Sequence, residues 1–230
     1  MLKSNSTEMQ DLFAYYVINS EKGTFLDLGA GGREPEIASN LGSNTYLLES
    51  IGWTGTLVDI RSIAIDWFKE NRKSSSYCMD LSKEESINEL SNIIEFPVDY
   101  ISFDIDKASL NCLKYFVDKK LHFKCMTYEH DQFRYQNYWQ PQSLSTERDI
   151  SRDMIRSLGP NYKLLFSDVF WMGPGHRDYH DGNRIHLNYS SFEDWWINLD
   201  YIDEDIMEIS STEILYSDCI SKLKDYRENK

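Results

Sequence analysis

Short apolar runs alternate with segments of helical periodicity along most of this chain. Runs rich in β-branched and aromatic residues predict strands at 24–27, 56–60, 76–79, 98–103, 123–128 and 162–170. Apolar residues recur at helical spacing in the segments 6–20, 45–52, 62–71, 83–94, 110–117, 146–158 and 212–226. In the helix at 62–71 we expect Ile63, Trp67 and Phe68 to face the core.

Alternation of strands and helices is typical of a mostly parallel sheet with helices on both faces. The sequence therefore predicts one α/β domain over residues 1–230 with a Rossmann-like fold. Its first helix is expected at about 6–20, where Ser6-Thr7-Glu8 provides a capping pattern.

Each of the first five predicted strands ends in an acidic residue. These residues are Asp27, Asp59, Asp80, Asp104 and the run from Glu129 to Asp131. Ligands of open α/β sheets bind beyond the carboxyl ends of the strands, so we expect these acids to gather along one rim. For each acid taken alone, the alternative is that it begins a loop or caps the next helix.

The first of these acids leads into a glycine-rich turn, Asp27-Leu28-Gly29-Ala30-Gly31-Gly32. Without a Cβ, such a turn lets backbone N–H groups approach a ligand closely. The spacing differs from the dinucleotide pattern Gly-x-Gly-x-x-Gly, and no Gly-Lys-Ser/Thr follows it. An acid two residues before the first glycine suits a ligand with a positive amino group, and S-adenosylmethionine is such a ligand.

This interpretation gives the rim a predicted cofactor site. Asp27 and the turn would hold the amino-acid part, Asp59 would accept hydrogen bonds from the ribose hydroxyls, and Asp80 would meet the adenine amine. The full predicted set of cofactor-binding residues is Asp27, Gly29, Ala30, Gly31, Asn44, Asp59, Ile60, Asp80, Leu81 and Asp104.

Further acidic residues and a histidine follow the fourth and fifth predicted strands, and three interpretations of their role stay open. Asp104, Glu129 and Asp131 offer hard oxygen ligands for Mg²⁺ or Mn²⁺, which would lower the pKa of a substrate hydroxyl. Alternatively, His130 or Asp104 acts directly as the general base. In the third interpretation these groups only hydrogen-bond the loop backbone.

The segment 171–191 is rich in Gly, His, Asp and Arg and is predicted to form a lid over a polar substrate. Its histidines, His176, His180 and His186, lack a nearby cysteine, so solvated side chains are favoured over a zinc site. The pair Trp195-Trp196 is expected in the core rather than as a platform for a sugar.

Charge and composition exclude several classes of protein. Lys+Arg number 24 and Asp+Glu 38, a net charge of −14, whereas a protein that grips nucleic acid needs clustered basic residues. The four cysteines form no C-x-x-C pair and predict buried, reduced thiols. We find no signal peptide and no membrane-spanning run, so a cytoplasmic protein without membrane partners is expected.

Several motifs together resemble the FkbM-type class I methyltransferases, which use S-adenosylmethionine. The matching pieces lie at 23–30, 43–55, 98–106, 127–131, 147–152 and 192–196. The resemblance implies a seven-stranded sheet with an antiparallel last strand, Asn44 beside the cofactor, and O-methylation of sugars, glycans or polyketide-type hydroxyls. One departure is Lys107-Ala108-Ser109, where the family often has Gly-Ser-Glu.

The expected partner is therefore a small-molecule or carbohydrate acceptor, and homo-oligomer formation is left open. Arg148, Arg152 and Arg177 are candidates to hold a phosphate or carboxylate of that acceptor, with surface ion pairs as the alternative. Two other functions are weighed. The altered segment after Asp106 motivates a cofactor-binding module without turnover, and a nucleic-acid methyltransferase is the weaker alternative, since its Asn/Asp-Pro-Pro-aromatic signature is missing.

Overall fold

The computed structural model describes residues 2–32, 39–130, 147–170 and 191–230. One mixed sheet organises them, with strands in the order β3-β2-β1-β4-β5-β7-β6-β8. The strands are β1 (Thr24–Leu28), β2 (Thr54–Asp59), β3 (Ser75–Cys78), β4 (Val98–Phe103), β5 (Phe123–Glu129), β6 (Tyr162–Phe170), β7 (Ser191–Asn198) and β8 (Ser211–Thr212).

The predicted doubly wound sheet is confirmed. Strands β1 to β5 are parallel neighbours, and β7 runs antiparallel to β5 and β6, between which it lies. The sheet has eight strands rather than the seven expected. The extra strand β8 replaces the start of the helix predicted at 212–226, because the backbone there pairs with β6: Glu213 donates to the Ser167 carbonyl, and the Ile214 carbonyl accepts from Phe170.

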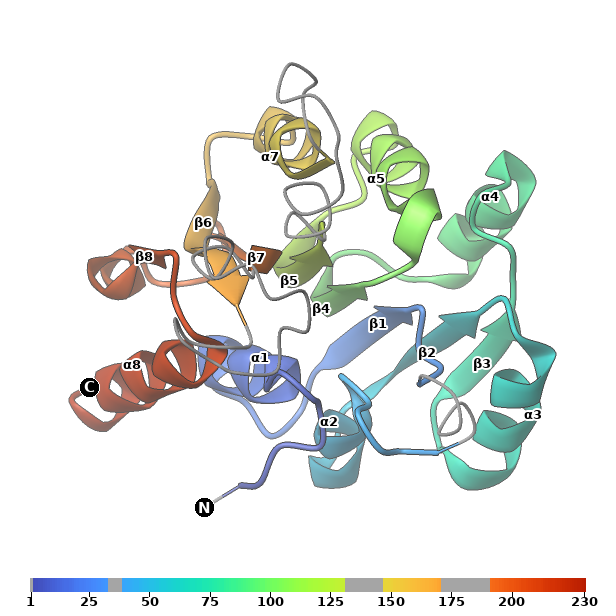
Figure 1. Cartoon of the computed structure of the whole chain (residues 1–230), viewed down its shortest axis with the longest axis horizontal. Helices are drawn as coiled ribbons and strands as arrows, with labels where there is room; N and C mark the ends of the chain where they lie inside the picture. The colour runs from blue at the N-terminus through green and yellow to red at the C-terminus, as the bar shows by residue number, and fades with distance from the viewer. Residues whose placement is uncertain (1, 33–38, 131–146, 171–190) are drawn as a thin grey trace, which may run out of the picture.

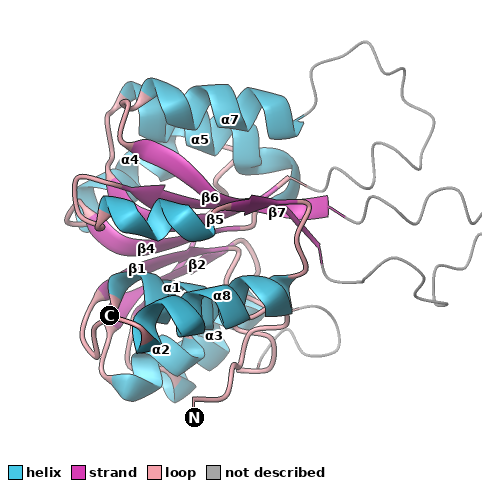
Figure 2. Cartoon of the chain, turned by 90° about the vertical axis from the view of Figure 1, so that its left-hand side faces the viewer, coloured by secondary structure: helices cyan, strands magenta, loops and turns pink. Residues whose placement is uncertain are grey.

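Helices cover both faces of the sheet (Figures 1 and 2). On one face lie α1 (Gln10–Ile18), α2 (Tyr46–Ile51), α3 (Ser62–Asn71) and α8 (Tyr216–Glu228). On the other lie α4 (Glu84–Ile93), α5 (Ser109–Asp118) and α7 (Glu147–Ser157). Short 3-10 helices occur at η1 (Asp106–Ala108) and η3 (Glu204–Ile209). Within the described residues, no helix is both long and apolar enough to cross a membrane.

Helix α1 begins at Gln10, four residues later than predicted. The preceding residues are held differently, by the buried carboxylate of Asp11. It accepts hydrogen bonds from the Ser4 hydroxyl at 2.6 Å and from the backbone N–H groups of Asn5 at 2.7 Å and Ser6 at 3.1 Å. Segment 4–8 is therefore held against Asp11, with Ser6 bridged to Gly42, instead of extending the helix.

Two apolar cores, one on each face of the sheet, enclose the tryptophans of β7. Trp195 is fully buried against Phe13 of α1, with ring centroids 4.8 Å apart, whereas Trp196 belongs to the core under α7. The expectation that both are core residues is confirmed. The expectation for Ile63 is wrong: it is 62% exposed, because the face of α3 toward the sheet carries Ala64 and Phe68.

Candidate functional site

The five acids that follow the sequence pattern lie along one rim of the sheet. Their strands neighbour each other in the order β3-β2-β1-β4-β5, which gives the order Asp80, Asp59, Asp27, Asp104, Glu129. Asp59 and Glu129 are the last residues of their strands, and Asp104 comes directly after β4. Asp27 is still inside β1, and Asp80 stands two residues beyond β3.

The glycine turn after β1 is fixed between the neighbouring strands. The N–H groups of Gly29 and Ala30 both donate to the Val58 carbonyl, at 2.9 and 3.0 Å. Gly29 has φ +85°, a left-handed conformation that favours glycine. A Cβ at this position would lie 1.6 Å from the Asp104 carbonyl oxygen, so only glycine fits.

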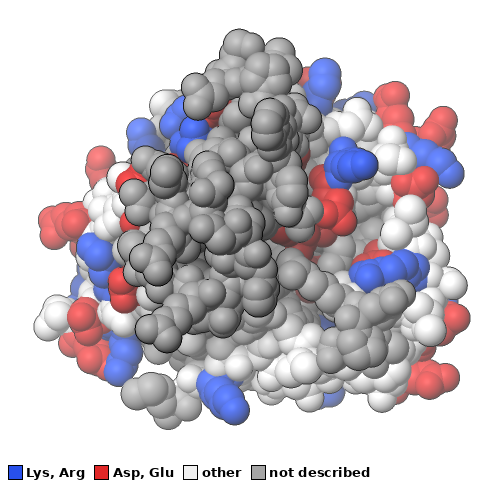
Figure 3. Space-filling model, in the orientation of Figure 1, with Lys and Arg blue, Asp and Glu red and all other residues white. Residues whose placement is uncertain are grey.

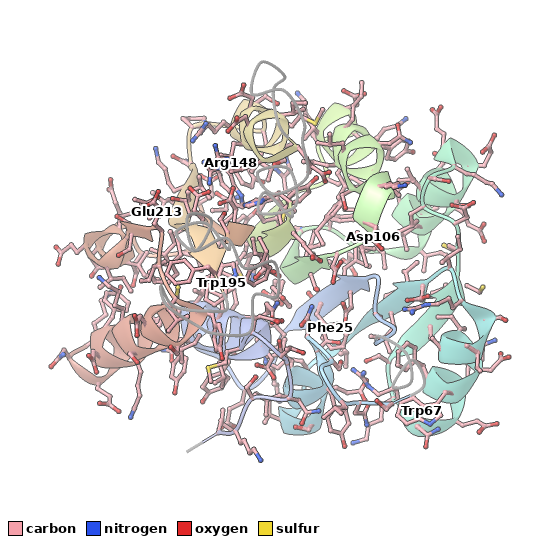
Figure 4. The ribbon with its side chains drawn as sticks, viewed as in Figure 1. Phe25, Trp67, Asp106, Arg148, Trp195 and Glu213 are labelled. Carbon is pink, nitrogen blue, oxygen red and sulfur yellow. The ribbon has the colours of Figure 1, made fainter. Side chains whose placement is uncertain are left out.

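Two cavities meet at this turn. The larger, of about 690 Å³, lies between the turn, segment 4–8, residues 41–44 and the start of β7. The smaller, of about 430 Å³, lies between the turn, the end of β2, residues 79–81 and η1. Asp104 and Glu129 line both cavities. Figure 4 shows Asp106, at the start of η1, between β4 and α5 on this side of the sheet.

Asp27 is the most deeply placed acid of the rim and is 2% exposed. Burial raises its pKa to about 6, although a hydrogen bond from the Thr45 hydroxyl at 2.7 Å and the nearby charge of Arg72 act in the opposite direction. The Arg72 guanidinium is itself buried and pairs with Glu49 at 3.0 Å. This polar network joins the turn to α2 beneath it.

The neighbouring segment 4–8 and Asn44 close the larger cavity on another side. The Asn44 amide donates to the Ser102 hydroxyl at 2.9 Å, and its oxygen accepts from the Ser6 hydroxyl at 2.9 Å. Asn44 thus connects the end of β4 to the N-terminal segment and lines the larger cavity.

Asp59 is already saturated with hydrogen bonds. Oδ1 accepts from the backbone N–H and Nε of Arg61, each at 2.8 Å. Oδ2 accepts from the Gly31 N–H and from Nη2 of Arg61, again at 2.8 Å. A carboxylate has about four lone-pair sites, and all of them are used. A ribose hydroxyl therefore reaches Asp59 only when the Arg61 side chain turns away.

The far end of the smaller cavity has an apolar wall. Ile60 is 62% exposed there, and Met79 and Leu81 are buried behind it. Asp80 stands beside them, with Oδ1 accepting from the Ser82 hydroxyl at 2.6 Å. The hydrogen bonds from Ser82 hold the pKa of Asp80 below its usual value. An exposed aliphatic surface beside a charged acceptor suits a flat heterocycle that carries an amino group.

The structure places His130 away from both cavities. Its imidazole is buried, with Nε2 3.6 Å from Oδ1 of Asp194, and the residue is not among the described residues that line either cavity. This position corrects the expectation that His130 faces a substrate as general base. The cause is strand alternation: Glu129 points to the cavity side, so the next residue points to the opposite face.

Ligand atoms of His130, Asp168 and Asp194 lie within 4.8 Å of one another. The two carboxylates already bind guanidinium groups. Asp194 takes a bidentate pair from Arg152 at 2.7 Å, and Asp168 binds both Arg152 and Arg148 at 2.9 Å. Arg148 and Arg152, both on α7, therefore serve an ion-pair network, but this network is largely buried and is not the surface ion pair considered as their alternative role.

The predicted metal ligands do not form a comparable group. Within the described residues, no set of three potential ligands with mutual distances of 4.8 Å or less includes Asp104 or Glu129. Asp131 lies outside the described part of the chain, as do Arg177, the predicted lid and its histidines His176, His180 and His186.

One residue of the site, Glu193, escapes the sequence pattern. It comes from β7, lines the larger cavity and is 3% exposed. Its Oε2 accepts from the indole Nε1 of Trp195 at 2.6 Å, and Oε1 faces Nε2 of Gln10 at 3.4 Å. In the sequence, only its position within an aromatic segment distinguishes this acid. It reaches the rim because β7 runs antiparallel beside β5.

The protonation of Glu193 predicts a pH-dependent stability. Burial raises its pKa to about 8, so the folded chain keeps a proton that the unfolded chain, with the usual pKa of 4.5, loses. The free energy of unfolding is expected to fall as the pH rises from about 4.5 to about 8. Asp27 adds a change of the same sign between pH 3.8 and about 6. Urea unfolding across this pH range should show the slope, and Glu193→Gln should remove most of it; an unchanged slope would contradict this assignment.

Among known proteins, this chain resembles several solved structures in fold. Sequence comparison with protein-family models and with curated proteins finds no match. A DUF574 family protein from Streptomyces avermitilis aligns with 12% identity over 84% of this chain and 80% of its own, with a TM-score of 0.47. An rRNA methylase from Streptococcus thermophilus aligns with 11% identity, coverage of 86% and 98%, and a TM-score of 0.45. An O-methyltransferase from Bacillus cereus, in complex with SAH, aligns with 16% identity over 71% of this chain and 73% of its own, with a TM-score of 0.39. At these low identities and TM-scores, an assignment of function rests on the residues of the site.

Proposed function

We propose that this chain is an S-adenosylmethionine-dependent methyltransferase that acts on a hydroxyl of a sugar, a glycan or a similar small polar acceptor. The observation that carries the proposal is the glycine turn, with buried Asp27 behind it and a cavity on either side. A cavity of about 430 Å³ is of the size that holds small ligands, and the adjoining larger cavity leaves room for a second reactant.

The residues of the smaller cavity fit a nucleoside. Ile60 and Leu81 offer apolar surface to adenine, and Asp80 offers an acceptor to its amine. Asp59 would offer an acceptor to the ribose once the Arg61 side chain turns away. In the larger cavity Asp27, the turn from Gly29 to Gly31, and Asn44 surround the place for the amino-acid part.

The bound cofactor supplies an electrophilic methyl group on a positively charged sulfur. The contribution of the protein is to hold the two reactants in line, since orientation alone supplies a large part of such rate enhancements. Asp104 lines both cavities, so it lies where the two ligands meet. Its carboxylate would favour a cationic centre there.

The acceptor class rests on the FkbM-type resemblance and on charge. The net charge of −14 disfavours a polyanionic partner. Figure 3 shows Asp and Glu as well as Lys and Arg spread around the border of this face, with further acidic side chains nearer its middle. All four cysteines are free and three are buried, in keeping with the proposed cytoplasmic location. The proposed reaction does not include Mg²⁺ or Mn²⁺, because no group of three potential ligands among the described residues contains Asp104 or Glu129.

Removal of two acids of the rim tests the cofactor site. The double variant Asp27→Ala/Asp59→Ala is expected to lose binding of both S-adenosylmethionine and S-adenosylhomocysteine, measured by calorimetry. Asp118→Ala is the matched control, because Asp118 is an exposed partner of Lys114 at the end of α5. Unchanged affinity in the double variant would overturn the assignment.

Incubation with labelled cofactor and nucleotide-sugars, with and without Mg²⁺, then separates the functions. Transfer of label supports the methyltransferase. Cofactor binding without transfer to any acceptor supports the non-catalytic module, and salt-sensitive RNA or DNA binding supports the nucleic-acid alternative.

The Arg61 side chain competes with the ribose for Asp59. Arg61→Met should therefore tighten binding of S-adenosylhomocysteine by about two- to fivefold, since a half-exposed ion pair of this kind contributes up to about 1 kcal/mol. Calorimetry on the variant and on Lys69→Met, an exposed ion-pair partner on α3, measures the effect. The guanidinium also donates to the carbonyls of Gly32 at 2.9 Å and Gly31 at 2.6 Å, so weaker binding in Arg61→Met would mean that its support of the turn, or a direct contact with the ligand, outweighs the competition for Asp59.

A further inference from the structure

Strand β7 runs antiparallel to β5, and one of its early residues places a further carboxylate at the rim. Because β7 pairs with β5, its early residues stand beside the carboxyl end of β5, and Glu193 lies in register with Glu129. Side chains of directly paired residues emerge on the same face of a sheet. Both residues therefore line the larger cavity, which also contains the turn residues and Asp104.

The contacts of Glu193 hold its carboxylate in a defined orientation. Oε2 is bound by Nε1 of Trp195, whose ring is fully buried against Phe13. Oε1 has a much longer contact, 3.4 Å from Nε2 of Gln10, near the outer limit of a hydrogen bond. Oε2 thus fixes the orientation of the carboxylate, and Oε1 can accept a hydrogen bond from a further donor.

Two other acids, Asp27 and Asp59, and the histidine are less suited to accept a proton in the larger cavity. Asp27 lies behind the turn with the Thr45 hydroxyl on Oδ2. Asp59 is saturated by Arg61 and Gly31. His130 lies on the opposite face of the sheet beside Asp194.

We propose that Glu193 accepts the proton of the acceptor hydroxyl in the larger cavity. This role rests on the proposed methyltransferase function. The O–H proton passes to Oε1 of Glu193 while its electron pair stays on the acceptor oxygen, which forms the new bond to the methyl carbon. The carbon–sulfur bond breaks, and its electron pair stays on sulfur. The proton on Glu193 then returns to solvent.

The charges around Glu193 suit this role. Glu8 from the N-terminal segment, Asp104 after β4 and Glu129 on β5 line the same cavity, and all three are acidic. Among the described residues, Tyr100 on β4 and Cys219 on α8 also interact electrostatically with Glu193. Burial and the negative charges of Glu8 and Asp104 raise the pKa of Glu193 to about 8, against the hydrogen bonds from Trp195 and Gln10. A general base works best with a pKa near the operating pH.

A positive sulfur next to Glu193 would favour its charged form, and this provides a test that needs no identified acceptor. Infrared spectroscopy follows the carboxylic-acid band of Glu193 through a pH titration of the whole protein. The titration is run without ligand, with S-adenosylmethionine, and with S-adenosylhomocysteine, which lacks only the methyl group and the positive charge on sulfur. The midpoint is expected near pH 8 without ligand. With S-adenosylmethionine it should lie about one pH unit or more below its value with S-adenosylhomocysteine.

Three variants assign the band. Glu193→Gln should abolish it, whereas Glu208→Gln, an exposed residue of η3, should leave it unchanged. Trp195→Phe keeps Glu193 but removes the indole donor, so its midpoint should rise. This third variant also assigns the band if Glu193→Gln fails to fold, as judged by circular dichroism.

The outcomes separate the two proposals. If calorimetry finds that neither ligand binds, the proposed function fails, and the role of Glu193 fails with it. If both ligands bind but the midpoint is the same with each, or if no band disappears in Glu193→Gln, the cofactor site stands and the role of Glu193 as proton acceptor is wrong.

Discussion

Replacing Gly29 with alanine is expected to destabilise the fold by roughly 2–5 kcal/mol and to abolish cofactor binding. The left-handed backbone costs a non-glycine residue roughly 1–2 kcal/mol, and forcing extra atoms into a packed site costs roughly 1–3 kcal/mol more. Here the added Cβ would lie 1.6 Å from the Asp104 carbonyl oxygen, so the backbone itself has to move. Urea unfolding measures the first effect, and calorimetry with S-adenosylhomocysteine measures the second.

Gly42→Ala is the matched control for this prediction. Gly42 also has a positive φ, of +78°, but a Cβ there would meet only the Thr7 side-chain oxygen, at 3.0 Å. It therefore carries the conformational cost without a clash against backbone. Equal destabilisation in the two variants would show that the close approach to Asp104 plays no part.

Removing the Arg152 guanidinium should destabilise the fold by about 3–5 kcal/mol, because a buried carboxylate would lose its cation. Asp194 is fully buried, and Arg152 supplies its bidentate pair. Arg152 and the nearby His130 hold the pKa of Asp194 well below its usual value, against the effect of burial. We expect Arg152→Met to lower the free energy of unfolding by this amount at neutral pH, measured in urea.

Arg156→Met, one turn further along α7, is the control for Arg152→Met. Its ion pair with Asp153 is exposed, and exposed pairs contribute at most about 1 kcal/mol. A loss below about 1 kcal/mol in Arg152→Met would mean that solvent reaches Asp194. In that case the network under α7 does not depend on its guanidinium.

Local pattern sufficed to predict the sheet and its rim. The strands from β1 to β5 are consecutive in the chain and parallel, and their ends follow from apolar runs that stop at polar residues. The turn at Gly29 was readable because its spacing is a local property. The arrangement of the final strands is not predictable from local pattern, because the position of β7 depends on pairing with strands that are distant in sequence.

Three details that the sequence pattern did not predict have separate causes. The position of Glu193 at the rim requires the antiparallel entry of β7, and the burial of His130 follows from strand alternation beyond Glu129. The saturation of Asp59 depends on the side-chain conformation of Arg61, which sequence spacing does not determine. Similarly, β8 forms where β6 offers a free edge, so residues expected in a helix became a strand.

Strand β7 has consequences for how this chain can vary in length. Glu193 and Trp195 point to the α1 face, whereas Asp194 and Trp196 point to the α7 face. A slip of one residue exchanges the two faces of a strand. A single insertion or deletion within Ser191–Asn198 would thus exchange the faces of the two acids: Glu193 would turn to the α7 face, or Asp194 to the α1 face, away from their present partners. We expect natural variants to accept substitutions in this strand but to place their length changes outside it.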